Sequence, residues 1–252
     1  MKNKIETSSG IRFSPGDKIT AHQIAKAIDH SLLKPEMTTQ EVIDGCKLAM
    51  DYDCATVCVK PCDVILADGI LKDSDVLVTT VIGFPHGHNL KQIKLLEAEI
   101  AIDQGCKELD MVLNIGRLKS REFDYIEDEI GAICDLSHKM GVIVKVIFEN
   151  AYLSEEEIIS ACRISEKAGA DFVKTSTGYA KSGATIKDIK LMRAVCSPAV
   201  RIKAAHGVRT LKNALEVLAA GAVRFGATAT KQIMDDARLL EAQGKLILPG
   251  EI

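Results

Sequence analysis

Short runs of apolar residues alternate with longer stretches of helical periodicity along most of the chain. The runs are nearly continuous in apolar character and rich in β-branched residues, which is typical of parallel strands buried on both faces. Eight strands are predicted, near 28–32, 54–59, 76–83, 108–113, 142–148, 171–175, 200–204 and 223–226. Helices are predicted near 38–51, 62–70, 90–104, 121–140, 154–168, 185–196, 209–220 and 228–243, with a further short helix near 20–27.

A weak internal repeat supports this alternation. At 105–110, 169–174 and 221–226 an apolar helix ends at glycine and a strand follows, and glycine is favoured where a helix ends. Strand and helix in regular turn predict one parallel sheet. An open doubly wound sheet is the competing architecture, but it usually carries a glycine-rich fingerprint after the first strand, and none is found. We predict a single-domain (β/α)8 barrel over 19–252, after a polar leader over 1–18.

Composition narrows the classes of partner. The 252 residues suit one α/β barrel, and an apolar content of 47% provides a large core. A net charge of −3 gives no reason to expect nucleic acid or an anionic membrane as a partner. The chain shows no secretory signal and no apolar run of about 18 residues, and its eight scattered cysteines fit free thiols. A cytoplasmic protein is therefore expected.

Three charged residues lie at or near the ends of predicted strands, where barrel active sites are built: Asp110, Lys174 and Lys203. Burial disfavours the ammonium form of Lys174, and only the free amine attacks a carbonyl. Neighbouring strands lie about 4.8 Å apart. If Lys174 and Lys203 lie at matching positions on neighbouring strands, each ammonium is expected to lower the pKa of the other. Asp110 is a candidate for proton transfer or for a salt bridge. The alternative for Lys174 is a side chain that only reaches solvent at the barrel mouth.

Two glycine-containing turns follow the last two predicted strands, at 205–209 and 225–228. Barrels often bind phosphate here, on backbone N–H groups at a helix N-terminus. Two possible metal motifs are weaker. The cysteines at 54, 58 and 62 do not have a known zinc spacing, and His86 and His88 are interpreted as part of a loop that lines the pocket. No metal or other cofactor is predicted.

Four segments in order, 28–35, 81–87, 145–149 and 172–178, together resemble the deoxyribose-phosphate aldolase family. The resemblance runs from about residue 20 to 235 and includes the specific sequence Lys-Thr-Ser-Thr-Gly that begins at Lys174. It implies a class I aldolase that needs no cofactor. Lys174 matches the Schiff base lysine, Lys203 the lysine that tunes it, and Asp110 the carboxylate of the proton relay. Asp29 matches a residue near a substrate hydroxyl.

The family reaction joins acetaldehyde to glyceraldehyde 3-phosphate, giving 2-deoxyribose 5-phosphate, and also runs in reverse. The resemblance therefore implies small aldehydes and sugar phosphates as partners, and a homo-oligomer, with a dimer expected. The residues predicted to bind substrate are Asp29, Thr177, Gly178, His206, Gly207, Val208, Arg209, Gly226 and Thr228.

The chain departs from the family pattern at the expected phosphate cradle. His206 replaces a glycine, Ala229 replaces a hydroxyl residue, and Asn150 replaces a threonine outside the cradle. A side chain at 206 is expected to obstruct close approach of the backbone, or a protonated His206 could itself bind phosphate. Three alternatives follow: a Schiff base aldolase for another sugar, a metal-dependent or isomerase barrel that uses His86 and His88, and a silent sugar-phosphate-binding barrel. The lysine pair with Asp110 argues against the last two.

Overall fold

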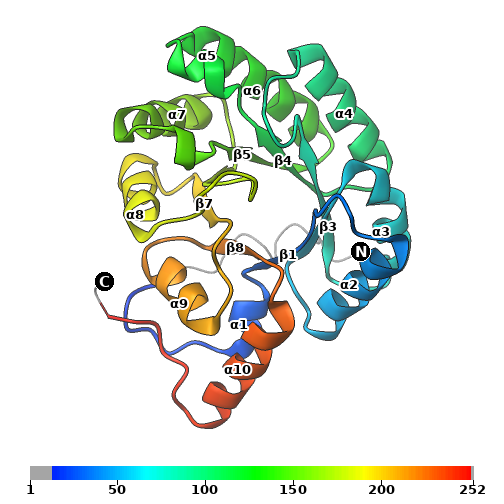
Figure 1. The fold of residues 1–252 in the computed structure, drawn as a ribbon, viewed down its shortest axis with the longest axis vertical. Coiled ribbons are helices and arrows are strands. Elements are labelled where there is room, and N and C mark those ends of the chain that lie inside the picture. The colour runs from blue at the N-terminus through cyan, green and yellow to red at the C-terminus, as the bar shows by residue number, and fades with distance from the viewer. Residues whose placement is uncertain (1–12, 251–252) are drawn as a thin grey trace.

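The computed structural model describes residues 13–250 as a closed barrel of parallel strands with helices around it (Figure 1). The strands are β1 Ile28–Leu32, β2 Thr56–Val59, β3 Leu77–Ile82, β4 Glu108–Val112, β5 Ile143–Ile147, β6 Phe172–Lys174, β7 Arg201–Ala204 and β8 Arg224–Ala227. They pair in chain order, and β1 pairs with β8. The predicted (β/α)8 barrel is confirmed. The open sheet is excluded, because every strand pairs with a neighbouring strand on both of its sides and the sheet has no free edge.

Helices follow the strands on the outside of the barrel. They are α1 Ala21–Ala25, α2 Thr39–Asp51, α3 Val64–Leu71, α4 Lys91–Asp103, α5 Ile115–Lys119, α6 Phe123–Lys139, α7 Glu155–Lys167, α8 Ile186–Val195, α9 Leu211–Ala219 and α10 Thr230–Ala242. The predicted helices match all of these except α5, which is too short to show helical periodicity. Two short 3-10 helices, η2 Pro61–Asp63 and η3 Asn150–Tyr152, were also not predicted.

Local sequence explains where the elements begin and end. Thr20, Thr38 and Ser154 each form a capping box at the start of a helix, with a Glu or Gln three residues later. At the other end, the repeated glycines at 105, 169 and 221 have positive φ, which lets the chain leave the helix and enter β4, β6 and β8. The strands themselves are almost entirely buried, as the continuous apolar runs predict.

Two segments near the ends of the described residues, 16–19 and 246–249, lie side by side. Residues 1–12 of the predicted leader lie outside the described residues. Lys18 forms an antiparallel bridge with Ile247, and the Gly16 N–H donates to the Pro249 carbonyl at 3.1 Å. A domain boundary at residue 18 stays a proposal. Within 13–250, no helix has both the length and the apolar character needed to cross a bilayer.

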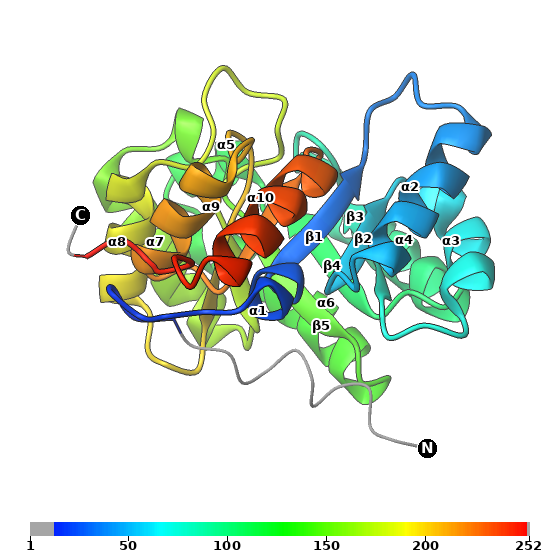
Figure 2. The same cartoon turned by 90° about the horizontal axis from the view of Figure 1, so that it is seen from below.

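Two long loops rise at the end of the barrel where the strands terminate. Figure 2 shows the loop after β1 and the loop after β6 on this end, above the ring of helices. The parallel strands all point their carboxyl ends the same way, so side chains from every strand can converge beneath these loops. The site described below lies there.

Candidate active site

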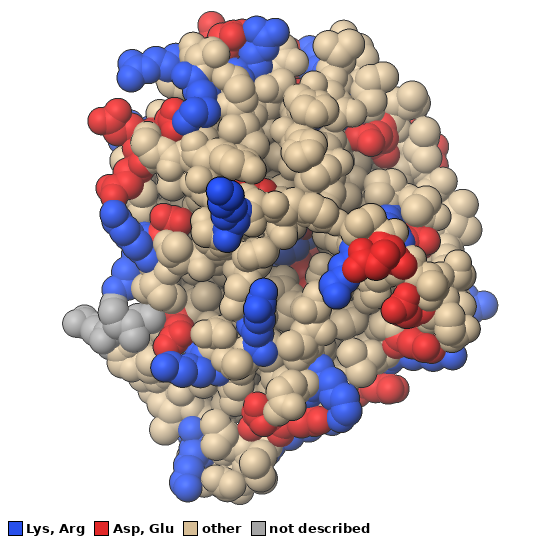
Figure 3. Space-filling view, in the orientation of Figure 1, with Lys and Arg blue, Asp and Glu red and all other residues tan. Residues whose placement is uncertain are grey.

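A cavity of about 500 Å³ opens at the carboxyl ends of the strands. In the space-filling view it is the hollow near the centre of the face, with basic side chains around it (Figure 3). Its lining includes every predicted site residue except Asp110: Asp29, Lys174, Thr177, Gly178, Lys203, His206, Gly207, Val208, Arg209, Gly226 and Thr228. The predicted residues therefore converge, although they come from β1, β6, β7, β8 and the loops after β6, β7 and β8.

Lys174 and Lys203 are direct neighbours across β6 and β7, in the same register, as predicted. Each amine lies 2.6 Å from the same oxygen, Asp110 Oδ2. Asp110 is fully buried beneath the cavity, on β4. One carboxylate oxygen thus joins the two amines and can pass a proton between them.

A third lysine, Lys145, also forms an ion pair with Asp110, and it was not predicted as a site residue. Lys145 pairs in register with Asp110 across β4 and β5, and its Nζ lies 2.8 Å from Oδ1. The same Nζ lies 2.5 Å from Glu108 Oε2. The signal in the sequence is a lysine flanked by Val144 and Val146 inside a buried strand, which is costly unless the charge is paired.

Arg224 and Glu108 extend this network to Asp29. The Arg224 guanidinium donates to Asp29 Oδ1, from Nε at 2.8 Å and also from the second terminal nitrogen. It also donates to Glu108 Oε2 at 3.2 Å. Lys203 forms an ion pair with the other oxygen of Asp29. Asp29 is therefore fixed from two sides, with its carboxylate at the wall of the cavity.

The buried network has an uneven number of charges. Its members are three carboxylates and four bases: Asp29, Glu108, Asp110, Lys145, Lys174, Lys203 and Arg224. If every group were ionised, the network would carry one net positive charge in a low-dielectric interior, which is unfavourable. A neutral amine at one lysine restores balance. Lys174 is the member whose partners allow this, because Asp110 is its only ion-pair partner among the described residues.

The pKa values of the two lysines on β6 and β7 shift in opposite directions. Burial lowers the pKa of Lys174; Asp110 opposes this and the Lys203 charge adds to it, so that the pKa stays below its ordinary value of 10.5. Burial also disfavours the charged form of Lys203, but Asp110 and Asp29 outweigh it and raise its pKa. The prediction that the lysines lower each other's pKa agrees with the direction for Lys174, but the pKa of Lys203 is raised, because Asp110 and Asp29 both lie beside its amine.

Carboxylates in the network keep their charge. Burial tends to raise the pKa of Asp110, but Lys145, Lys174 and Lys203 more than compensate and hold it well below its usual range. The pKa of Asp29 also lies below its usual range. Burial tends to raise it, but the positive charges of Arg224, Lys203 and Lys145 outweigh this effect. Near neutral pH, Asp110 is therefore an anion that accepts hydrogen bonds from the three neighbouring amines.

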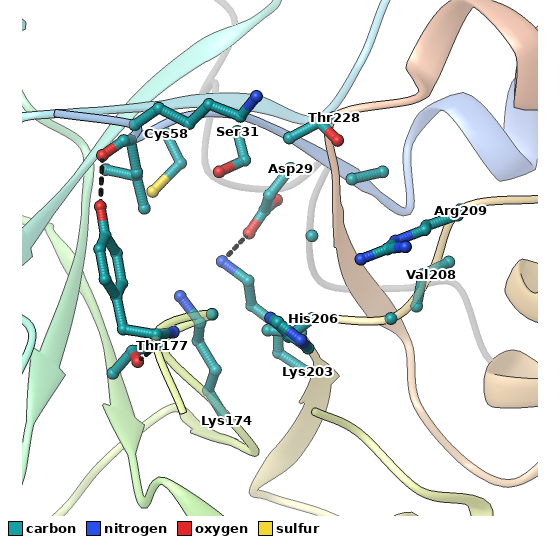
Figure 4. Close-up of a pocket in the computed structure, with 18 of the residues that line it drawn as sticks. Asp29, Ser31, Cys58, Lys174, Thr177, Lys203, His206, Val208, Arg209 and Thr228 are labelled. Atoms are coloured by element: carbon teal, nitrogen blue, oxygen red, sulfur yellow. Dashed lines mark hydrogen bonds and ion pairs between the residues drawn. The ribbon is translucent and has the colours of Figure 1, made fainter. Parts of the chain in front are cut away.

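The remaining predicted residues surround the amines. Figure 4 shows Val208 and Arg209 on one side of the cavity, Lys174 and Thr177 on the other, and Asp29 with Lys203 between them. Thr177 is held by a residue that was not predicted, Glu149, which accepts bonds from its N–H at 3.2 Å and from its hydroxyl. Glu149 is buried and has φ +57°, a strained conformation that points to a positioning role for this loop.

His206 occupies a backbone position that favours glycine, with φ +64°. Its carbonyl accepts the Ala184 N–H at 3.0 Å, so the loop after β6 closes onto it. Gly183 makes this possible, because a Cβ there would lie 2.2 Å from the His206 oxygen. Gly207 keeps φ +98°, and no heavy atom lies within 4 Å of where its Cβ would be. The imidazole therefore lines the cavity while the backbone at Gly207 stays open to an approaching ligand.

The metal motifs do not gather into one site. Cys54 and Cys58 are buried and Cys62 is exposed. The rings of His86 and His88 stack with centroids 5.5 Å apart. Between residues 13 and 250, no three His, Cys, Asp or Glu side chains lie close enough together to hold a metal ion.

Known proteins resemble this chain over nearly its whole length. A deoxyribose-phosphate aldolase of Caldanaerobacter subterraneus subsp. tengcongensis is 50% identical over 214 residues, covering 84% of this chain and 93% of the relative. A crystal structure of a candidate deoxyribose-phosphate aldolase from Coccidioides immitis superposes with a TM-score of 0.85 at 36% identity, covering 93% of this chain and 95% of the other. The enzyme of Aeropyrum pernix, described as a unique tetramer, gives 0.83 at 26% identity, covering 95% and 98%.

A model of the DeoC/LacD family of aldolases matches residues 23–236, which span the barrel from α1 to α10 and contain every member of the buried charge network. The chain belongs to the DeoC/LacD aldolase family.

Proposed function

We propose that this protein is a class I aldolase that reversibly cleaves 2-deoxy-D-ribose 5-phosphate to acetaldehyde and D-glyceraldehyde 3-phosphate through a Schiff base on Lys174. The observation that carries the proposal is the lysine pair in the cavity. Lys174 has the lowered pKa of a nucleophile, and Lys203 stays charged beside it. Relatives that match over the whole barrel act on deoxyribose phosphate by name, so the other-sugar and silent-barrel alternatives are not favoured.

In the cleavage direction, the Lys174 amine adds to the C1 carbonyl of the open-chain sugar. Loss of water gives an iminium ion, and Asp110 and Lys203 relay the protons for this step over 2.6 Å contacts. A base then takes the proton of the C3 hydroxyl, the C2–C3 bond breaks, and its electron pair neutralises the iminium as an enamine. Glyceraldehyde 3-phosphate leaves. Protonation of the enamine and addition of water release acetaldehyde and restore the amine.

Asp29 and the turn after β7 are proposed to hold the rest of the sugar. Asp29 faces the cavity while Arg224 and Lys203 keep it ionised, so it can accept a hydrogen bond from a substrate hydroxyl. The phosphate is proposed to lie against Gly207, Gly226 and Arg209, where the backbone is open and one exposed guanidinium is available. His206 and Thr228 border the same region.

The first kinetic test compares cleavage of deoxyribose 5-phosphate with cleavage of unphosphorylated deoxyribose. We expect Arg209→Gln to lower kcat/KM for the phosphate ester by about 10- to 100-fold, the value of one charge-assisted hydrogen bond. Its effect on deoxyribose should be much smaller. Lys212→Gln is the control, because this neighbouring side chain is 82% exposed and lies outside the cavity. A wild type that does not prefer the ester would favour the alternative of another sugar and contradict the proposed phosphate site.

The pH dependence of kcat/KM should report the ionisation of Lys174 in the free enzyme. Because the neutral amine is the reactive form, activity should rise with pH through a pKa below 10.5. Lys203→Met removes the neighbouring cation and frees Asp110 to hold the Lys174 proton, so the rising limb should move to higher pH. We also expect kcat/KM at pH 7 to fall about 100-fold or more, because one relay group is lost.

Lys203→Arg is the matched variant for this profile. It keeps a positive charge beside Lys174, so the rising limb should stay near its wild-type position even if kcat falls. If the rising limb of kcat/KM had the same apparent pKa in the wild type, Lys203→Met and Lys203→Arg, this would contradict the assignment of Lys203 as the group that lowers the pKa of Lys174.

Assembly and location are part of the proposal. We propose a homo-oligomer, and the predicted dimer stays a prediction, since the structural relative from Aeropyrum pernix is described as a tetramer. Light scattering on the purified protein measures the number of subunits. A cytoplasmic location is supported by the eight cysteines, all of which are free thiols.

A further inference from the structure

Tyr179 connects two loops across the mouth of the barrel. Its hydroxyl donates to the Leu33 carbonyl at 3.1 Å, so the loop after β6 is joined to the loop after β1. Its ring packs edge-on against Phe84, with centroids 5.5 Å apart and planes at 84°. In the closed barrel, β7 and β8 lie between β6 and β1 on one side, and β2 to β5 on the other. The contact therefore divides the mouth into two parts.

A cavity lies in each part. Apart from Cys58 on β2, the active-site cavity takes its lining from β1, β6, β7, β8 and the loops after them, with Lys203, Arg209 and Thr228 among the lining residues. A second cavity, of about 280 Å³, lies on the side of β2 and β3 and is called here the side cavity. Its lining is Leu33, Pro35, Lys60, Pro61, Val81, Phe84, Pro85, Glu97 and Tyr179. Leu33, Pro35 and Tyr179 line both cavities, so these three residues form the wall between them.

The side cavity is suited to an apolar group. Its two charged residues are already engaged by the protein, since Lys60 donates to the Met37 carbonyl at 3.1 Å and pairs with Asp63 at 3.4 Å. Glu97 accepts the Gly83 N–H at 2.8 Å. The remaining walls are proline, valine, leucine and aromatic side chains. With a volume of about 280 Å³, against roughly 30 Å³ for a water molecule in the liquid, it has room for a short alkyl chain.

The position of Lys174 decides which part of a substrate could reach this cavity. Under the proposed function, the phosphate end lies near Arg209 and the carbonyl carbon is bonded to Lys174, on the opposite side of the active-site cavity (Figure 4). On the side of the carbonyl carbon that faces away from the phosphate, the only group is the second substituent of this carbon. This is hydrogen in an aldehyde donor and an alkyl group in a ketone donor.

We propose that Tyr179 determines donor specificity by closing the active-site cavity to ketones, and that the side cavity is a subsite for the alkyl group of a ketone donor once this wall is opened. The proposal rests on the proposed function, because it assumes a Schiff base donor on Lys174. The ring of Tyr179 is the part of this wall that packs against Phe84 in the side cavity, so removing the ring should open the wall more than removing the hydroxyl alone.

The reaction with a ketone balances without any additional reagent. The Lys174 amine adds to the ketone carbonyl and water leaves, giving an iminium ion. Loss of a proton from the α-methyl group gives an enamine, whose carbon attacks the carbonyl of the acceptor aldehyde and forms the new C–C bond. The acceptor oxygen takes up the proton, water adds to the iminium, and a β-hydroxyketone and the free amine are released.

The experiment measures kcat/KM for 2-butanone and for acetaldehyde as donors, with D-glyceraldehyde 3-phosphate as acceptor. Tyr179→Ala should raise the ratio of 2-butanone to acetaldehyde by about 10-fold or more, the effect of admitting a small apolar group. Tyr179→Phe, which keeps the ring, should change the ratio by less than about threefold. Borohydride trapping of 2-butanone on Lys174 should increase in Tyr179→Ala only.

Tyr152→Ala is the matched control. This tyrosine is 55% exposed, against 49% for Tyr179, and lines neither cavity, so its ratio should equal that of the wild type. An unchanged ratio in a folded Tyr179→Ala protein, or an equal increase in Tyr152→Ala, would overturn the proposal. If the wild type neither cleaves deoxyribose 5-phosphate nor forms an acetaldehyde adduct, the proposed function fails instead, and the two failures are thereby distinguished.

Discussion

Lys174→Met should lower kcat for cleavage of deoxyribose 5-phosphate by about 10⁴-fold or more, the scale seen when a covalent nucleophile is removed. Methionine fills a similar space but has no amine to attack the carbonyl. The protein should still fold, because Asp110 keeps Lys145 and Lys203 as partners at 2.8 and 2.6 Å. Steady-state kinetics and circular dichroism measure the two effects.

Lys174→Arg separates charge from reactivity. Arginine keeps a positive charge beside Asp110 but cannot lose its proton in a protein, so it should be as inactive as methionine. If Lys174→Arg or Lys174→Met retained more than about a hundredth of wild-type kcat, Lys174 would not be the covalent nucleophile.

Asp110→Asn should reduce both stability and activity. The carboxylate contacts Lys145, Lys174 and Lys203 in a fully buried site, and its neutralisation leaves these amines without their common anion. Breaking a buried ion pair on one side costs about 3–5 kcal/mol of unfolding free energy. The loss of a proton relay should lower kcat by about 10²- to 10⁴-fold. Urea denaturation and steady-state kinetics measure these effects.

The pH profile of Asp110→Asn gives a further check on this account. Asp110 raises the pKa of Lys174, so without it the pKa should fall and the rising limb of kcat/KM should move to lower pH. This is opposite to the shift expected for Lys203→Met. Shifts in the same direction in both variants would contradict the proposed arrangement, in which one carboxylate and one ammonium act oppositely on Lys174.

Most of the fold follows from the sequence because it depends on local patterns. The apolar runs locate β1 to β8 within a few residues, and glycines at helix ends mark the entry to β4, β6 and β8. The α5 helix was missed, since five residues show no period. The order of the strands also follows, because a regular alternation of strand and helix leaves few ways to build a parallel sheet.

The active site could be predicted only in part. Asp110, Lys174 and Lys203 could be singled out as candidates because each stands out in an apolar strand and the motifs around them resemble a known family, and the structure brings the three side chains into contact. Lys145 and Arg224 also lie in buried strands, but their partners depend on the register of the barrel and on where long side chains reach. The raised pKa of Lys203 depends on Asp110 and also on Asp29, which lies 174 positions away from Lys203 in the sequence.

Residues on the loops were harder still to predict. Tyr179 and Glu149 contact Leu33, Phe84 and Thr177, and no periodic pattern in the sequence predicts these contacts. Whether His206 obstructs a ligand or binds it could not be decided from the sequence, because this depends on which way the ring points. The open backbone at Gly207 appears only when the turn after β7 is seen in three dimensions.

The central claim is a Schiff base on Lys174, and one measurement tests it directly. The wild-type protein is incubated with acetaldehyde and sodium borohydride, its intact mass is measured, and the modified peptide is mapped. A single reduced two-carbon adduct on Lys174, absent from Lys174→Arg, is the result that the account predicts. An unmodified Lys174 under conditions that label a known class I aldolase, or an adduct on Lys203 or Lys145 instead, would contradict it.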